Sequence, residues 1–293
     1  MKKGLSLILT GALFVCLLAG CGTSTGDANS SGSAGSSLGT INVISREDGS
    51  GTRGAFVELL KIEDAGGNDA TCDSAEITNS TSVMMTTVAG NKAAIGYASL
   101  GSLSSDVKAV SIDGVEATVD NIKAGTYTVA RPFNIVYKEG SLTPLAQDFM
   151  AYILSTDGQK IINQDGYIGV DGGKAYTPSK LSGTVTLAGS TSVSPLMEKL
   201  ADAYKALNPN VTIEIQQSGS SAGITSATDG VCDFGMSSRE LTASEASALT
   251  CVKIATDGIA VIVNKDNDIT NLTKDQVKQI FMGETTNWSD LSK

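Results

Sequence analysis

The stretch INVISREDGSGTRGAFVELL, residues 41–60, passes from a β-branched run through a turn of glycines and hydroxyl side chains into an amphipathic segment. The run predicts a strand over 41–45, and the segment predicts a helix over 53–62. A strand that enters a helix through a short turn is typical of α/β architecture. The turn also leaves free backbone N–H groups at the helix N-terminus, where the helix dipole favours an anion.

Two further stretches repeat this design, VTLAGSTSVSPLMEKL at 185–200 and IEIQQSGSSAGITSA at 213–227. Each turn alone is also what ordinary helix N-capping requires, so a single turn does not indicate binding. Three such turns together with Arg46 favour a site for a tetrahedral oxyanion, because a guanidinium can bind two of its oxygens at once. Asp48, two residues after Arg46, is placed to hold that guanidinium.

Alternation of short apolar runs and amphipathic segments continues to the end of the chain and predicts an α/β fold. Further strands are expected at 93–98, 107–112, 133–137, 185–188, 211–216 and 259–263, and further helices at 142–154, 195–207 and 272–281. Capping boxes at 242–245 and 273–276 support helix starts, and the second moves the start of the last helix to about Lys274. The segment 171–182, DGGKAYTPSKLS, is interpreted as a connector between two well-patterned regions.

The N-terminus has the pattern of a secretory signal over residues 1–20, with two lysines before an apolar run that is too short to span a membrane stably. The run ends in Leu18-Ala-Gly-Cys21, which predicts that Cys21 carries lipid and anchors the mature chain to the cell membrane. A Gly/Ser/Thr-rich tether, 21–40, follows. The alternative is an ordinary signal peptide with an incidental cysteine.

Composition excludes several classes of function. The formal net charge is −10, and loss of the two signal lysines makes it −12, so a basic nucleic-acid footprint is absent. The chain has no histidine, which excludes Ser-His and Cys-His catalysis and His-ligated metals; no metal or other cofactor is expected. Cys72, Cys232 and Cys251 are interpreted as buried thiols, with a Cys232–Cys251 disulfide left open.

Four runs resemble those of the phosphate-binding proteins of ABC importers, with supporting runs at 95–100 and 286–291. The four are SREDGSGTR (45–53), GSTSVSP (189–195), SGSSAG (218–223) and DFGMSSR (233–239). The resemblance covers nearly all of residues 41–293. It implies a two-lobed, periplasmic-binding-protein-like fold of type II with the ligand in the interlobe cleft. It also implies a monomeric, extracytoplasmic receptor that captures inorganic phosphate for an ABC permease and is not an enzyme.

The resemblance carries specific positions onto this chain as phosphate ligands: Arg46, Ser50, Gly51, Thr52, Thr191, Ser192, Ser220 and Ser238. Several relatives have an aspartate at the Ser238 position, where it accepts the proton-bearing oxygen of phosphate. Serine there leaves the acceptor open. Asp48 is the nearest carboxylate in the binding turns, and it either takes that role or only orients Arg46.

The motifs occur in an unusual order, because family members usually begin with the GSTS turn, whereas here the REDGSGT turn comes first. The chain is therefore interpreted as a circular permutation in which 171–182 joins the usual termini. By the family pattern the chain crosses between lobes near 128–133 and 258–265. One lobe then comprises 41–130 with 265–293, and the other comprises 131–264.

Three alternatives remain open at this stage. A receptor for sulfate, arsenate or molybdate would use the same donors. A secreted phosphatase would use Ser190, Thr191 or Ser192 as nucleophile, but it lacks a histidine base. A surface adhesin or signalling receptor could keep the fold without transport.

Overall fold

The structure is a computed structural model and describes residues 38–292. The signal segment, Cys21 and nearly all of the tether lie outside the described residues. None of the helices in the described part is long and apolar enough to cross a membrane.

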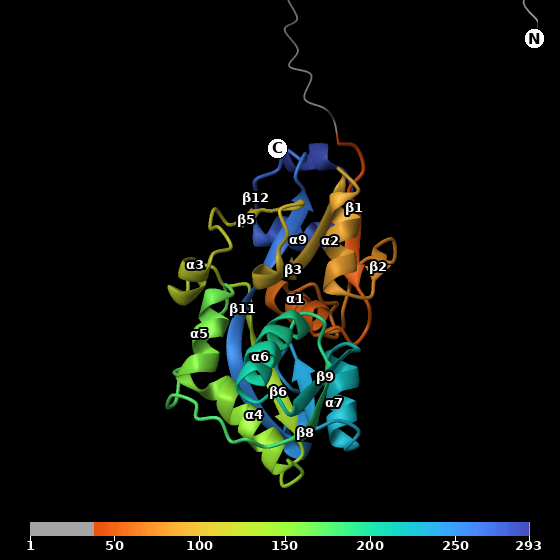
Figure 1. Cartoon of the computed structure of the whole chain (residues 1–293). Coiled ribbons are helices and arrows are strands. Elements are labelled where there is room, and N and C mark those ends of the chain that lie inside the picture. Colours follow the sequence, from red (N-terminus) through yellow and green to blue (C-terminus); the bar gives the residue numbers. More distant parts are fainter. Residues whose placement is uncertain (1–37, 293) are drawn as a thin grey trace, which may run out of the picture. The chain divides into compact units, whose positions relative to one another are not determined.

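The central feature is a mixed β-sheet whose strand order is β2-β1-β3-β11-β6-β10-β8-β9 (Figure 1). Its strands are β1 (Asn42–Arg46), β2 (Glu76–Thr78), β3 (Ala94–Ser99), β6 (Ala130–Tyr137), β8 (Gly183–Gly189), β9 (Val211–Gln217), β10 (Phe234–Ser237) and β11 (Thr250–Asn264), with β4 (Val107–Ala109) and β7 (Ile168–Gly169) also paired to β11. A separate pair joins β5 (Ser111–Ile112) to β12 (Asn271–Leu272). Strands alternate with helices along the chain, which confirms the α/β class.

Strand β11 pairs with strands in both halves of the sheet. From Thr250 to Gly258 it pairs antiparallel with β6, and from Ile259 to Val263 it pairs antiparallel with β3. Figure 1 shows it as one continuous strand. Because β6 and β11 run side by side where the pairing changes, these two strands carry the chain from one half of the sheet to the other.

A helix begins at each of the three predicted turns, and the first of them begins and ends two residues earlier than the expected 53–62. The helices are α1 (Gly51–Leu60), α2 (Thr81–Ala89), α3 (Val119–Lys123), α4 (Pro144–Leu154), α5 (Thr156–Gln164), α6 (Ser194–Leu207), α7 (Ser220–Thr228), α8 (Ala243–Ala248) and α9 (Lys274–Phe281), with 3-10 turns η1 (Leu100–Ser102) and η2 (Trp288–Ser292). Both capping boxes are present, at Thr242 and at Thr273.

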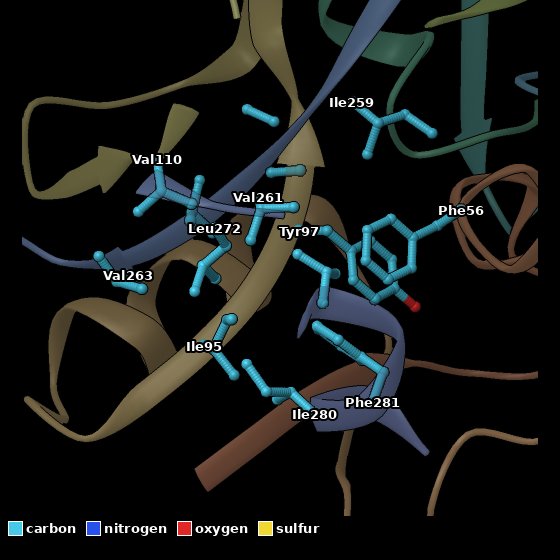
Figure 2. Close-up of a cluster of buried hydrophobic side chains, with 14 of the residues drawn as sticks. Phe56, Ile95, Tyr97, Val110, Ile259, Val261, Val263, Leu272, Ile280 and Phe281 are labelled. Carbon is cyan, nitrogen blue, oxygen red and sulfur yellow. The ribbon is translucent and has the colours of Figure 1, made fainter. Parts of the chain in front are cut away.

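The largest apolar clusters form two separate cores. The first draws on residues 41–129 and 259–288, and Figure 2 shows Phe56, Tyr97 and Phe281 packed together in it. The rings of Phe56 and Tyr97 stack with centroids 4.0 Å apart. The second core draws on residues 133–255. The lobe boundaries derived from the resemblance remain a prediction.

Three expectations differ from the structure. The strand expected over 107–112 is split at Val110, because Ser111 and Ile112 leave β11 to pair with β12. The strand expected over 259–263 begins nine residues earlier, at Thr250. Cys72, Cys232 and Cys251 are free thiols but are not buried as expected, since Cys251 is exposed and the other two are partly exposed; the Cys232–Cys251 disulfide that was left open is absent.

The connector 171–182 is irregular, as predicted, and the carboxylates of Asp148 and Asp157 hold it in place. Asp148 Oδ2, on α4, accepts hydrogen bonds from the hydroxyls of Tyr176 (2.6 Å) and Ser179 (2.8 Å) in the connector. The same oxygen accepts from Tyr204 on α6 (2.6 Å). Asp157, on α5, accepts from the Tyr176 amide at 2.7 Å, so the connector is fixed to both α4 and α5.

Candidate anion-binding site

The first binding turn packs directly against the other two. Ser50 caps α1 by accepting a hydrogen bond from the Arg53 amide, and Gly49 has φ +81°, which favours glycine. A Cβ added at Gly51 would lie 2.3 Å from Ser220 Oγ and 2.7 Å from Ser238 Oγ. Only a glycine lets the start of α1 approach these hydroxyls.

Arg46 ends β1 and is buried, with 2 % of its surface exposed. Its Nη2 donates to Thr191 Oγ1 at 3.0 Å. Its Nε and Nη2 both donate to the carboxylate of Glu47 at 2.8 Å, so Glu47 is the residue that orients the guanidinium. The guanidinium thus joins the first turn to the second.

The expected pairing of Asp48 with Arg46 is wrong. Asp48 is 98 % exposed and contacts Arg53 at 3.0 Å instead. The expectation relied only on the two-residue spacing. Side chains two residues apart share a face within a strand, but β1 ends at Arg46.

The hydroxyl side chains of the predicted turns form two groups of contacts. Thr52 Oγ1 lies 2.8 Å from Ser192 Oγ. In the second set, the Ser238 hydroxyl accepts from Ser190 Oγ at 2.9 Å and lies 3.4 Å from Ser220 Oγ. The structure thus brings together the expected positions except the Ser50 side chain, which caps α1.

Two residues of this cluster were not predicted from sequence. Thr81, the first residue of α2, has its hydroxyl 3.3 Å from Thr191 Oγ1 and 3.1 Å from Ser192 Oγ. The run TNSTS at 78–82 is a further hydroxyl-rich turn between a strand and a helix, and it was the available signal. Glu47 was also missed, although it directly follows Arg46.

A second guanidinium lies behind the site. Arg131 Nη1 donates to the backbone carbonyl of Ser238 at 3.2 Å and its Nη2 pairs with Asp257 at 3.1 Å, with each side chain 1 % exposed. Burial lowers the pKa of Arg131 and raises the pKa of Asp257, against the attraction between the two charges. Arg131 reaches the site through the Ser238 carbonyl, whereas the Arg46 guanidinium contacts the hydroxyls of Thr191 and Thr81, so Arg46 is the cation placed to meet an anion.

The arrangement provides hydrogen-bond donors and one guanidinium but no activated nucleophile. Ser190 Oγ accepts weakly from the amides of Ser192 and Val193 and donates to Ser238. Among the residues that the structure describes, no group of three or more His, Cys, Asp or Glu side chains could hold a metal ion. The cluster can therefore bind an anion, and its carboxylate, Glu47, is held by the Arg46 guanidinium and not placed as a base beside a hydroxyl.

Comparison with known proteins defines the class of this fold and site. Residues 25–157 and 174–293 match the family model described as a PBP superfamily domain. The chain is 54% identical to phosphate-binding protein PstS 2 of Streptococcus agalactiae, over 99% of each chain. It is 46% identical, again over 99% of each, to phosphate-binding protein PstS 2 of Streptococcus pneumoniae.

A solved structure gives the same result. The crystal structure of a phosphate-binding protein of a phosphate ABC transporter from Streptococcus pneumoniae is 48% identical and has a TM-score of 0.70, with 86% of this chain and 100% of that chain covered. The chain belongs to the PBP superfamily and, within it, to the PstS family of phosphate-binding proteins. The expected family and fold class are confirmed.

Proposed function

We propose that this chain is an extracytoplasmic receptor that captures inorganic phosphate and delivers it to the permease of an ABC importer. The observation that carries the proposal is the buried Arg46, whose guanidinium donates to Thr191 of a distant segment. The same cluster contains Thr52, Ser192 and Ser220 hydroxyls from the starts of three helices, and such donors suit an oxyanion. The names of the full-length relatives support phosphate as that oxyanion.

In this proposal, two lobes close on the ligand and together form the binding site. One lobe comprises 41–130 with 265–293 and the other comprises 131–264, with β6 and β11 as the connecting strands. The two separate hydrophobic cores support this division. Contacts between the proposed lobes include Thr52 with Ser192 and the Ser221 amide with the Gly49 carbonyl at 3.1 Å. Closure would bring the donors of both lobes onto one ligand.

The remaining parts of the proposal concern attachment and chain order. Cys21 carries a lipid that anchors the mature, monomeric protein to the membrane, and 171–182 joins the usual termini of a permuted chain. The Asp148 contacts support the second point, because they fix the connector to its own lobe. Mass spectrometry of the membrane-extracted protein should find an acylated Cys21 at the N-terminus; an unmodified mature chain in the medium would contradict the anchor.

A competition titration tests the ligand. Purified residues 22–293 are titrated with phosphate in a calorimeter, then with sulfate, arsenate and molybdate, and each anion is also used to displace bound phosphate. Phosphate should bind and the sulfate complex should be much weaker. If sulfate binds as well as phosphate, the protein is a general tetrahedral-oxyanion receptor instead.

A test for catalysis separates the receptor from a phosphatase. The same preparation is incubated with a chromogenic phosphomonoester, with and without divalent metals. We expect no turnover, because the Ser190, Thr191 and Ser192 hydroxyls contact only other hydroxyls, backbone amides and Arg46. Turnover that depends on one of these hydroxyls would contradict the receptor proposal.

A further inference from the structure

Thr81 lies at the meeting point of two binding turns. It is 5 % exposed and begins α2. Its hydroxyl is 3.4 Å from Arg46 Nη1, 3.3 Å from Thr191 Oγ1 and 3.1 Å from Ser192 Oγ. The last two residues follow β8 and belong to a segment more than 100 positions away in the chain. Thr81 therefore contacts both the guanidinium and the second binding turn.

The Thr81 hydroxyl is not occupied by its own helix. The N-cap of α2 is Ser80, whose side chain accepts from the Val83 amide. The neighbouring Thr78 shows the structural use of a buried threonine, because its hydroxyl donates to the Ser45 carbonyl at 3.0 Å. Thr81 instead has only side-chain partners, and all of them are positions expected to bind the anion.

The hydrogen-bonding capacity of a hydroxyl decides what Thr81 can do. A hydroxyl has one proton and two acceptor lone pairs, and the guanidinium of Arg46 can only donate. One lone pair therefore faces Arg46, and the proton remains for an acceptor. The two hydroxyl contacts, at 3.3 and 3.1 Å, are longer than the usual 2.7–2.8 Å of an O–H···O bond. The guanidinium contact, at 3.4 Å, is longer than the usual 2.9–3.0 Å of an N–H···O bond, so all three are weak.

An anion would be a better acceptor than these neighbours. Hydrogen bonds to a charged group are shorter and roughly twice as strong as neutral ones. The first turn of α2 carries no acidic side chain, so the positive end of its dipole is also available to an anion. An oxyanion bound by Arg46, Thr191 and Ser192 would lie next to the Thr81 hydroxyl, which touches all three.

We propose that Thr81 is a direct ligand of the oxyanion and that α2 contributes a fourth helix N-terminus to the site. This inference rests on the proposed function and adds a binding residue from the turn 78–82. Thr81 belongs to the proposed lobe of residues 41–130 with 265–293, and its hydroxyl faces Thr191 and Ser192 of the other lobe.

The test compares Thr81→Val, Thr81→Ser and Thr78→Val by calorimetric titration with inorganic phosphate. Valine has the shape of threonine without the hydroxyl, serine keeps the hydroxyl, and Thr78→Val removes a buried hydroxyl of the same segment that lies outside the site. We expect Thr81→Val to weaken phosphate binding by about 10-fold or more, as loss of a hydrogen bond to a charged group implies. Thr81→Ser should stay within about threefold of wild type.

Stability measurements separate binding from folding. Thermal unfolding with and without saturating phosphate is measured for each variant. The phosphate-induced rise in Tm should be smallest for Thr81→Val and near wild type for Thr78→Val, even if both variants lower the ligand-free Tm. If Thr81→Val binds phosphate within twofold of wild type, the role of Thr81 is wrong and the proposed function stands. If the wild-type protein itself does not bind phosphate, both are wrong.

Discussion

Arg131 of β6 and Asp257 of β11 are register partners in adjacent antiparallel strands and form an ion pair from which solvent is excluded. Asp257 also accepts a hydrogen bond from Ser99 at the end of β3 at 2.9 Å. The pair thus links β3 of the first half of the sheet to β6 of the second, at the point where β11 changes partners. Arg131 extends the link to the Ser238 carbonyl in the site.

Asp257→Asn should lower the free energy of unfolding by about 3–5 kcal/mol, because it leaves the Arg131 guanidinium buried without its counter-charge. The double variant Arg131→Met with Asp257→Leu should recover much of that loss, since it leaves no unpaired charge. Urea denaturation measures both. A single variant as stable as wild type would contradict the importance of the pair.

Glu245 makes the folding stability of the protein depend on pH. Its hydrogen bonds from Arg239 Nη1 and Nη2, both 2.8 Å, lower the pKa of Glu245 from 4.5 to about 2. A lowered pKa in the folded state stabilises the protein above pH 4.5, and that stabilisation is lost as the pH falls from about 4.5 to about 2.

Glu245→Gln should therefore be less stable than wild type at pH 7, by about 1 kcal/mol for a partly exposed pair. The difference should disappear as the pH approaches 2. Urea denaturation across this range measures it, with Glu240→Gln as a control at an exposed neighbouring carboxylate. A constant difference at every pH would mean that charge pairing with Arg239 is not its cause.

Gly51→Ala should reduce phosphate affinity by at least about tenfold, because its Cβ would push apart the turns that meet there. Gly54→Ala, one turn along the same helix, is the matched control. Its Cβ meets only Arg239 Cδ at 3.4 Å, so it should leave affinity unchanged and stabilise α1 slightly. Calorimetry and thermal unfolding on both variants distinguish a local clash from a general effect on the helix.

The selectivity for phosphate over sulfate should change on substitution of Ser238 and not on substitution of Asp48. Asp48→Asn should change neither phosphate nor sulfate binding, because its side chain is 98 % exposed. Ser238→Asp should reject sulfate more strongly than wild type, since a buried carboxylate repels a fully ionised oxyanion and accepts the phosphate proton. Competition titrations provide the comparison. Increased sulfate binding in Asp48→Asn would restore Asp48 as the discriminating acceptor.

Sequence reasoning found most residues of this cluster because the three hydroxyl-rich turns each follow a recognisable strand and precede a helix, and the resemblance supplied the individual ligand positions, which stay a prediction. It missed Thr81 because β2 is only three residues long and α2, TSVMMTTVA, is rich in β-branched residues with low helix propensity. The Arg46–Glu47 pairing was missed because it depends on where β1 ends, which a sequence pattern defines only to within a few residues.

The fold was predictable to a similar degree. The starts of α6, α7 and α9 follow local capping or turn chemistry, which a short stretch of sequence contains. The extent of β11 was not predictable from a local pattern, because Thr250 to Gly258 is fixed by pairing with β6, more than 110 residues earlier. The split at Val110 likewise depends on β12, which lies far along the chain.

The central claim is that this chain binds phosphate through Arg46, and the most direct measurement is a calorimetric titration of wild type, Arg46→Met and Arg53→Met with inorganic phosphate. Arg53 is the matched control, since it pairs with Asp48 and Asp69 and donates to the Arg46 carbonyl. Wild type should bind, Arg46→Met should bind at least about tenfold more weakly, and Arg53→Met should lose much less. Equal losses in the two variants, or a wild type that does not bind phosphate, would contradict the claim.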